Sequence, residues 1–250
     1  MELREKVCLI TGGSGGIGSA TALEFARRGA SIAINGLPAD EELARCVKRQ
    51  VELLGQRCMV ISGDVADPTE AARYVTATAE SFGGVDILVH CAGGPASGRL
   101  LEVCSESWYR AFDIHVHAAF HLCRAAVPYM VQKGEGAILL ISSAAGSRGC
   151  LGAIAYGVVK GSIPPLTRAM ARELAQHKIR VNCVSPGIIR TRFQDYLTPE
   201  QTRNNIEDRI PLHREGTPED VAQVLAMLAE NDFITGENIA IDGGMTMRMA

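Results

Sequence analysis

Aromatic residues are scarce in this chain, and neither sign of charge dominates it. Aromatic side chains make up 5% of the 250 residues, and the formal net charge is −3. Nucleic-acid sites need a basic surface, and single strands also need stacking aromatics, so this composition argues against nucleic-acid binding. The sequence also lacks an apolar run long enough to span a bilayer and a signal-peptide pattern, so we expect no membrane segment.

The cysteines lack the spacings that bind metals. Eight are present, without a CxxC pair. Several, such as Cys8 and Cys183, lie within apolar runs and resemble small buried hydrophobic residues. This pattern favours a reducing compartment, and we expect a cytoplasmic protein without a metal site. His117 and His121 lie four residues apart, but no carboxylate accompanies them as in HExxH.

Short apolar segments alternate with longer helical ones along the chain. A hydrophobic content of 47% is enough for one large core. The strand-like segments are mostly apolar throughout, which is typical of strands covered on both faces. They are Val7–Ile10, Ser31–Ile34, Met59–Ile61, Ile87–Val89, Ala137–Ile141, Val181–Val184 and Asn238–Ile241. The helical segments are Ile17–Arg28, Asp40–Leu54, Pro68–Phe82, Glu106–Gln132, Gly152–His177 and Pro218–Glu230. The alternation predicts a single α/β domain over residues 1–250, a doubly wound, parallel, seven-stranded sheet of the Rossmann type.

A glycine-rich turn follows the first strand directly and opens a helix. It reads Thr11-Gly12-Gly13-Ser14-Gly15-Gly16-Ile17-Gly18. Glycines at such a turn let the backbone approach a pyrophosphate at the helix N-terminus. Its position between strand and helix predicts a dinucleotide site.

A second pattern places a tyrosine and a lysine one helical turn apart. Tyr156 and Lys160 are four residues apart, about one helical turn, so they share a helix face. A phenol holds its proton until pH ~10, but a nearby ammonium favours the phenolate. Tyr156 could therefore act as an acid or base nearer neutral pH. Ser143 lies thirteen residues before the tyrosine.

Taken in order, these motifs resemble the short-chain dehydrogenase/reductase family over nearly the whole chain. They are the TGxxxGIG turn, Asp64-Val65, His90-Cys91-Ala92-Gly93, Ser143, Tyr156, Lys160, Pro186-Gly187 with Thr191, and Asp242-Gly243-Gly244. The resemblance implies an NAD(P)-dependent oxidoreductase that transfers a hydride between a nicotinamide and a secondary alcohol or ketone. It implies Tyr156 as acid/base, Lys160 as the residue that tunes it, and Ser143 as a ligand of the substrate oxygen.

The resemblance also implies which residues bind the cofactor. They are Gly12, Ser14, Gly16, Ile17, Gly18, Asn35, Asp64, Val65, Ala92, Gly93, Tyr156, Lys160, Pro186, Gly187, Ile188 and Thr191. NAD preference usually comes from an acidic residue at the end of the second strand, a position that we assign to Asn35. No basic residue stands at Gly15 or soon after Asn35 to hold a 2′-phosphate, and Asp40 is nearby. We therefore expect NAD rather than NADP.

Two features depart from the family pattern. The family's fourth catalytic residue is an asparagine, and the matching position is His115. A histidine has a pKa near 6.5, so it either joins a proton relay with an added pH dependence or only replaces the asparagine structurally through a backbone hydrogen bond. Pro164-Pro165 lies inside the helix that carries Tyr156 and Lys160, where proline is expected to bend the helix.

The segment Arg190–Arg214 interrupts the alternation and predicts a substrate-binding loop or lid. We expect the substrate pocket to be lined by Gly94, Pro95, Ser97, Ala144, Ala145, Leu151 and Ile189. Arg148, Arg190 and Arg192 either bind a carboxylate or phosphate of the substrate, or they are solvated or make intersubunit contacts. The sequence does not identify the small-molecule substrate.

Two alternatives to the main interpretation remain. One is a 3-oxoacyl-thioester reductase that uses NADPH, and the other is a catalytically silent nucleotide sensor or scaffold. The C-terminal motif resembles that of family members that form homotetramers, in which Met245–Ala250 would reach a neighbouring subunit.

Overall fold

The computed structural model describes residues 1–195 and 197–247, and within them the predicted sheet is confirmed. Seven parallel strands lie in the order β3-β2-β1-β4-β5-β6-β7. They are β1 (Val7–Thr11), β2 (Ser31–Gly36), β3 (Cys58–Ser62), β4 (Ile87–His90), β5 (Gly136–Ile141), β6 (Ile179–Pro186) and β7 (Asn238–Ile241). The order reverses direction between β1 and β4, where a crevice opens at the carboxyl ends of the strands.

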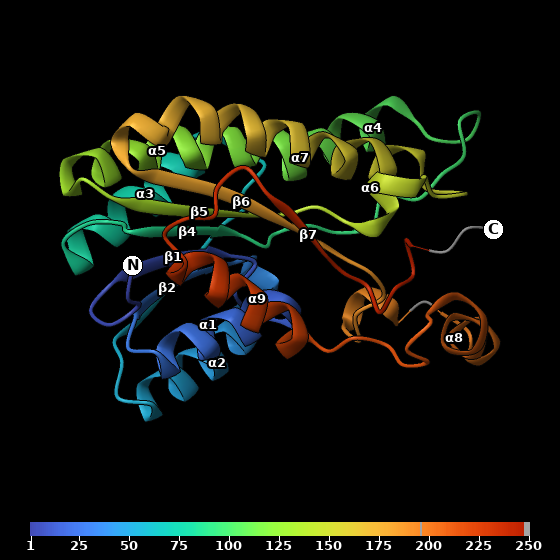
Figure 1. The fold of residues 1–250 in the computed structure, drawn as a ribbon, viewed down its shortest axis with the longest axis horizontal. Coiled ribbons are helices and arrows are strands. Elements are labelled where there is room, and N and C mark those ends of the chain that lie inside the picture. The colour runs from blue at the N-terminus through green and yellow to red at the C-terminus, as the bar shows by residue number, and fades with distance from the viewer. Residues whose placement is uncertain (196, 248–250) are drawn as a thin grey trace.

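Helices cover both faces of the sheet (Figure 1). One face carries α1 (Gly16–Arg27), α2 (Glu41–Leu53) and α9 (Pro218–Glu230). The other carries α3 (Pro68–Phe82), α4 (Ser105–Phe112), α5 (Ala118–Lys133), α6 (Ala144–Arg148) and α7 (Ile154–Leu174). Successive strand residues feed the two cores in turn: Leu9 packs with Leu122 on one face and Ile10 with Phe25 on the other. This explains why the strands are apolar throughout.

Three predicted helices differ from the observed elements. The segment 106–132 divides into α4, a π-helical turn η2 (Asp113–His117) and α5. The segment 152–177 becomes α7 followed by a 3₁₀ turn η3 (Ala175–His177), and a 3₁₀ turn η1 (Pro38–Asp40) precedes α2. The helix α7 continues through both Pro164 and Pro165. None of the described helices is long and apolar enough to cross a membrane.

The segment after β6 is partly helical, which the sequence-based prediction missed. It contains a 3₁₀ turn η4 (Arg192–Gln194), the helix α8 (Pro199–Asn204) and a π-helical turn η5 (Asn205–Arg209). A capping box between Thr198 and Gln201 starts α8, and this Thr-x-x-Gln pattern is visible in the sequence. Figure 1 shows α8 beyond the end of the sheet, away from both helical layers.

Candidate active site

A cavity of about 1380 Å³ lies at the carboxyl ends of the strands. Every residue that the sequence assigned to catalysis or to the cofactor lines it: Gly12, Ser14, Gly16, Ile17, Gly18, Asn35, Asp64, Val65, Ala92, Gly93, His115, Ser143, Tyr156, Lys160, Pro186, Gly187, Ile188 and Thr191. Most of the expected substrate wall lines it too, but Pro95, Ser97 and Arg190 do not. Arg190 instead donates from Nε to the carboxylate of Glu215 at 3.2 Å.

The glycine-rich turn is built for close backbone approach. Gly12 has φ +66°, and a Cβ there would lie 2.7 Å from the backbone nitrogen of Ala92. A Cβ on Gly18 would lie 2.1 Å from the carbonyl oxygen of Gly12. The N-cap residue of α1 is Gly15, which provides no side-chain cap, and no acidic residue stands in the first turn. The helix therefore presents unoccupied N–H donors and a positive dipole end toward the cavity, which suits a pyrophosphate.

The second strand ends without a charged side chain toward the cofactor. Asn35 is only 2% exposed, and its amide nitrogen donates to the carbonyls of Ile61 at 3.3 Å and Gly63 at 3.0 Å. Both amide hydrogens of Asn35 are thus used within the protein, where they join the end of β2 to β3 and to the loop after it. Asn35 still lines the cavity, and its role in cofactor binding stays a prediction. Asp40 also lines the cavity, and its Oδ1 lies 4.0 Å from Arg192 Nη1.

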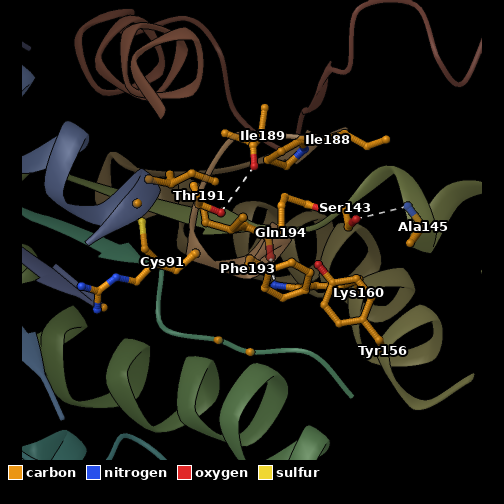
Figure 2. A pocket seen from close by; sticks show the side chains of 18 of the residues that line it. Cys91, Ser143, Ala145, Tyr156, Lys160, Ile188, Ile189, Thr191, Phe193 and Gln194 are labelled. Carbon is orange, nitrogen blue, oxygen red and sulfur yellow. Dashed lines mark hydrogen bonds between the residues drawn. The ribbon is translucent and has the colours of Figure 1, made fainter. Parts of the chain in front are cut away.

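Tyr156, Lys160 and Ser143 come together on the opposite wall. The first turns of α7 carry Tyr156 and Lys160, and Lys160 Nζ lies 5.8 Å from the centre of the tyrosine ring. Lys160 Nζ also donates to the carbonyl of Ile141 at 2.9 Å. Ser143 caps α6, where its Oγ accepts from the backbone nitrogen of Ala145 at 3.2 Å (Figure 2). Burial lowers the pKa of Lys160 to about 8.

His115 is held in the π-helical turn η2, beside Tyr156. The two rings meet edge to face with centroids 5.9 Å apart. His115 Nε2 is 3.1 Å from the carbonyl of Gly94, which can only accept, so Nε2 carries the proton and Nδ1 is an acceptor. Nδ1 is buried and has no hydrogen-bond partner among the described residues.

The surroundings of His115 disfavour its charged form. Burial first, and then the charge of Lys160, hold the pKa of His115 well below its usual 6.5. This direction favours a neutral ring around pH 7 and argues against the alternative in which His115 adds a pH dependence near 6.5. The backbone hydrogen bond to Gly94 matches the structural alternative for this residue.

His90 ties the end of β4 to the same π-helical turn. Its Nε2 donates to the carbonyl of Ile114 at 3.1 Å, so its Nδ1 accepts from Thr11 Oγ1 at 2.8 Å. Thr11 Oγ1 in turn accepts from the backbone nitrogen of Ala92 at 3.3 Å. One buried chain of hydrogen bonds thus connects the glycine-rich turn, the end of β4 and the backbone next to His115.

The segment Arg190–Arg214 lies over the cavity, with Tyr196 outside the described residues. Its two ends are tied together, because Arg190 N donates to Gly216 O and Gly216 N donates to Ile188 O, both at 2.9 Å. Between them, Phe193 packs against Tyr156 with ring centroids 5.6 Å apart, and Figure 2 shows the rings side by side. No specific signal in the sequence pointed to Phe193, because only the fold brings it to Tyr156.

Two further patterns from the sequence are the His117–His121 pair and the C-terminal Asp242-Gly243-Gly244 motif. His117 faces Asp113 at 2.9 Å rather than His121. Met245 and Thr246 line the cavity of their own chain, while residues 248–250 of the predicted intersubunit tail lie outside the described part. Asp242 accepts from the backbone nitrogens of Gly244 and Thr246 and so shapes this segment.

Comparisons with known proteins agree with this geometry. Residues 12–246 match the family model described as enoyl-(acyl carrier protein) reductase. The 3-oxoacyl-[acyl-carrier-protein] reductase of Thermotoga maritima is 37% identical over 99% of this chain and 100% of its own length. An L-rhamnose 1-dehydrogenase (NAD(P)(+)) of a Sphingomonas species is 36% identical over 99% of this chain and 98% of its own length.

A solved structure has the same architecture. A short-chain type dehydrogenase/reductase from Mycobacterium ulcerans superposes with a TM-score of 0.90 at 31% identity, covering 100% of this chain and 93% of the other. Its fold, the sequence relatives and the residues that line the cavity lead to one conclusion. This chain belongs to the short-chain dehydrogenase/reductase family, whose members are oxidoreductases that act on CH–OH groups with a nicotinamide cofactor.

Proposed function

We propose that this protein interconverts a secondary alcohol and its ketone through Tyr156, Lys160 and Ser143. The observation that carries the proposal is their meeting on one wall of the cavity into which the glycine-rich turn also opens. When bound, the nicotinamide accepts the hydride in oxidation and supplies it in reduction. In oxidation, the phenolate of Tyr156 takes the proton of the substrate hydroxyl, and in reduction the phenol returns it.

The neighbouring groups have separate tasks. Ser143 uses an oxygen lone pair for Ala145 N, which leaves its own hydroxyl hydrogen to donate to the substrate oxygen. The ammonium of Lys160 stabilises the phenolate of Tyr156 from one side. Phe193 covers the same ring from the lid side and limits water there. The segment Arg190–Arg214 is thus the substrate-binding lid of a single catalytic domain.

His115 provides a neutral hydrogen-bond acceptor, its Nδ1, in this site. Its protonated Nε2 is fixed to Gly94, and the bare Nδ1 is buried. A water or a substrate hydroxyl that donates to Nδ1 would satisfy it. In this role the histidine takes part by accepting a hydrogen bond rather than by gaining charge.

NAD is the cofactor that we favour over NADP. A 2′-phosphate needs a cation, whereas Gly15 and Gly36 provide none, and the Arg192 guanidinium beside them in the lining is already paired with Asp40. The uncharged Asn35 adds nothing to this preference, because its amide nitrogen donates to Ile61 O and Gly63 O. Initial rates with NAD and with NADP, compared as kcat/KM, test the preference, and a higher value with NADP would contradict it.

A 3-oxoacyl-thioester reductase that uses NADPH is the second candidate, and the Thermotoga relative favours it. A silent nucleotide sensor is the third. A screen of secondary alcohols, sugars, hydroxy acids and a short 3-oxoacyl thioester, each with both cofactors, separates the three. Turnover of an alcohol with NAD supports the main proposal. Turnover of the thioester alone with NADPH supports the second, and cofactor binding without any turnover supports the third.

Assembly and location are proposed from the resemblance and from the state of the cysteines. We propose a homotetramer on the resemblance, which analytical ultracentrifugation tests through the mass of the species in solution. The eight cysteines are all free thiols, which supports a reducing, cytoplasmic environment.

A further inference from the structure

The carbonyl of Lys160 has lost its usual helical partner. In an α-helix a carbonyl accepts from the N–H four residues further on, and here that residue is Pro164. Proline has no N–H, so it leaves the carbonyl open. Lys160 is only 6% exposed, and a buried carbonyl without a partner is destabilising.

A side chain from the neighbouring strand end replaces the missing donor. Ser142 Oγ donates to Lys160 O at 2.8 Å, and Ser142 is itself only 2% exposed. The preceding residue, Ile141, accepts from Lys160 Nζ at 2.9 Å. Two consecutive residues at the end of β5 therefore hold both ends of Lys160, its backbone carbonyl and its ammonium.

We propose that Ser142 is a positioning residue for Lys160, needed because Pro164 removes the helical donor. The inference rests on the proposed role of Lys160 beside Tyr156. Without the Ser142 hydroxyl, the Lys160 carbonyl has neither Pro164 nor Ser142 as a donor, and this turn of α7 can shift away from β5. The ammonium then moves relative to the Tyr156 ring, now 5.8 Å away, and stabilises the phenolate less.

The dependence on Pro164 makes the proposal testable by a double-mutant cycle. Four proteins are compared: wild type, Ser142→Ala, Pro164→Ala and the double variant. An alanine at position 164 restores an N–H, so the Lys160 carbonyl no longer needs Ser142. The cycle therefore measures whether the effect of Ser142 exists only when proline stands at 164.

One readout needs no substrate. The protein has 5 tyrosines, so the titration of Tyr156 is isolated as the ultraviolet tyrosinate absorbance of each variant minus that of its Tyr156→Phe counterpart. We expect Ser142→Ala to raise the midpoint by about one pH unit, a tenfold change in the equilibrium, with Pro164 present. In the Pro164→Ala background the same substitution should shift it by less than about a third of that.

The second readout is kcat on the alcohol found in the screen. We expect Ser142→Ala to lower it about tenfold with Pro164 present and less than about twofold in the Pro164→Ala background. Ser162→Ala is the matched control on the same helix. Ser162 Oγ donates to Val159 O at 2.7 Å, a carbonyl whose helical donor Ile163 is intact. This variant should leave both readouts unchanged.

Each outcome decides the proposal. Equal effects of Ser142→Ala with proline and with alanine at position 164, or no effect in either background, would overturn it. If Ser142→Ala does not fold but the double variant does, the rescue supports the proposal; if neither folds, it is contradicted. If no alcohol is turned over, the proposed function fails, whereas the tyrosinate titration still reports on the positioning of Lys160.

Discussion

In the cofactor half of the cavity the deciding feature is the lack of side chains, whereas in the catalytic half it is a set of buried polar ones. A Cβ on Gly12 or Gly18 would run into backbone atoms at 2.7 and 2.1 Å. Across the cavity, Lys160 is held by Ile141 and Ser142, and His115 by Gly94. We therefore expect substitutions that add atoms to be most damaging in the cofactor half, and substitutions that remove hydrogen-bonding groups to be most damaging in the catalytic half.

Ser143→Ala should give the largest loss among the variants that leave Tyr156 and Lys160 in place. It removes the hydroxyl that donates to the substrate oxygen, so kcat should fall roughly a hundred- to a thousandfold. Cofactor affinity, measured by titration calorimetry, should stay within about twofold because Ser143 lies across the cavity from the glycine-rich turn. An unchanged kcat would remove Ser143 from the catalytic group.

Lys160→Met tests the cost of the buried ammonium. The folded pKa of about 8 lies below the unfolded value of 10.5, so between these values the unfolded chain binds more protons. The free energy of unfolding of wild type should then rise with pH from about 8 to 10.5, relative to Lys160→Met, by up to about 3 kcal/mol. Urea unfolding of both proteins over this range measures the difference, and parallel pH profiles would contradict it.

Gly18→Ala tests the crowded turn, with Gly15→Ala as its control. The added methyl at position 18 meets Gly12 O, and we expect a loss of about 1–3 kcal/mol in stability and weaker cofactor binding. A Cβ on Gly15 would meet no atom of the other described residues within 4 Å, chain neighbours aside, and the backbone there is extended, so alanine should change little. Thermal unfolding with and without NAD compares the two. Equal losses of stability and of NAD binding in the two variants would show that backbone crowding at the glycine-rich turn does not set the properties of the cofactor half.

His115→Asn should have the smallest effect on pH dependence. Because burial already keeps His115 neutral, the pH–rate profile should keep its shape between about pH 5.5 and 7.5, a range set by the ordinary histidine pKa of about 6.5. Rates of the two proteins are compared at each pH, so that a uniform change in kcat is separated from a change in shape. If the wild-type profile has a limb near pH 6.5 that is absent from the variant, His115 titrates during turnover and the proton-relay alternative is supported.

The two halves also differ in how well the sequence predicted them. The glycine turn and the Tyr-x-x-x-Lys pair follow from local spacing, because each motif is fixed by a few neighbouring residues. The parallel sheet follows from the alternation of apolar and helical segments. The hydrogen bonds of Asn35 could not be predicted, because its partners, Ile61 and Gly63, come from another strand and the loop after it. Phe193 was missed, and the lowered pKa of His115 could not be predicted, because packing and burial arise only when distant segments meet.

The role of Tyr156 as acid and base is decided by comparing turnover by wild type and by Tyr156→Phe under the same conditions. Phenylalanine keeps the ring packing against Phe193 and His115 but has no proton to exchange. We predict that wild type oxidises a secondary alcohol with NAD and that Tyr156→Phe, while still binding NAD, is slower by about a thousandfold. Equal turnover by the two proteins, or binding of NAD by wild type without any turnover, would contradict the account.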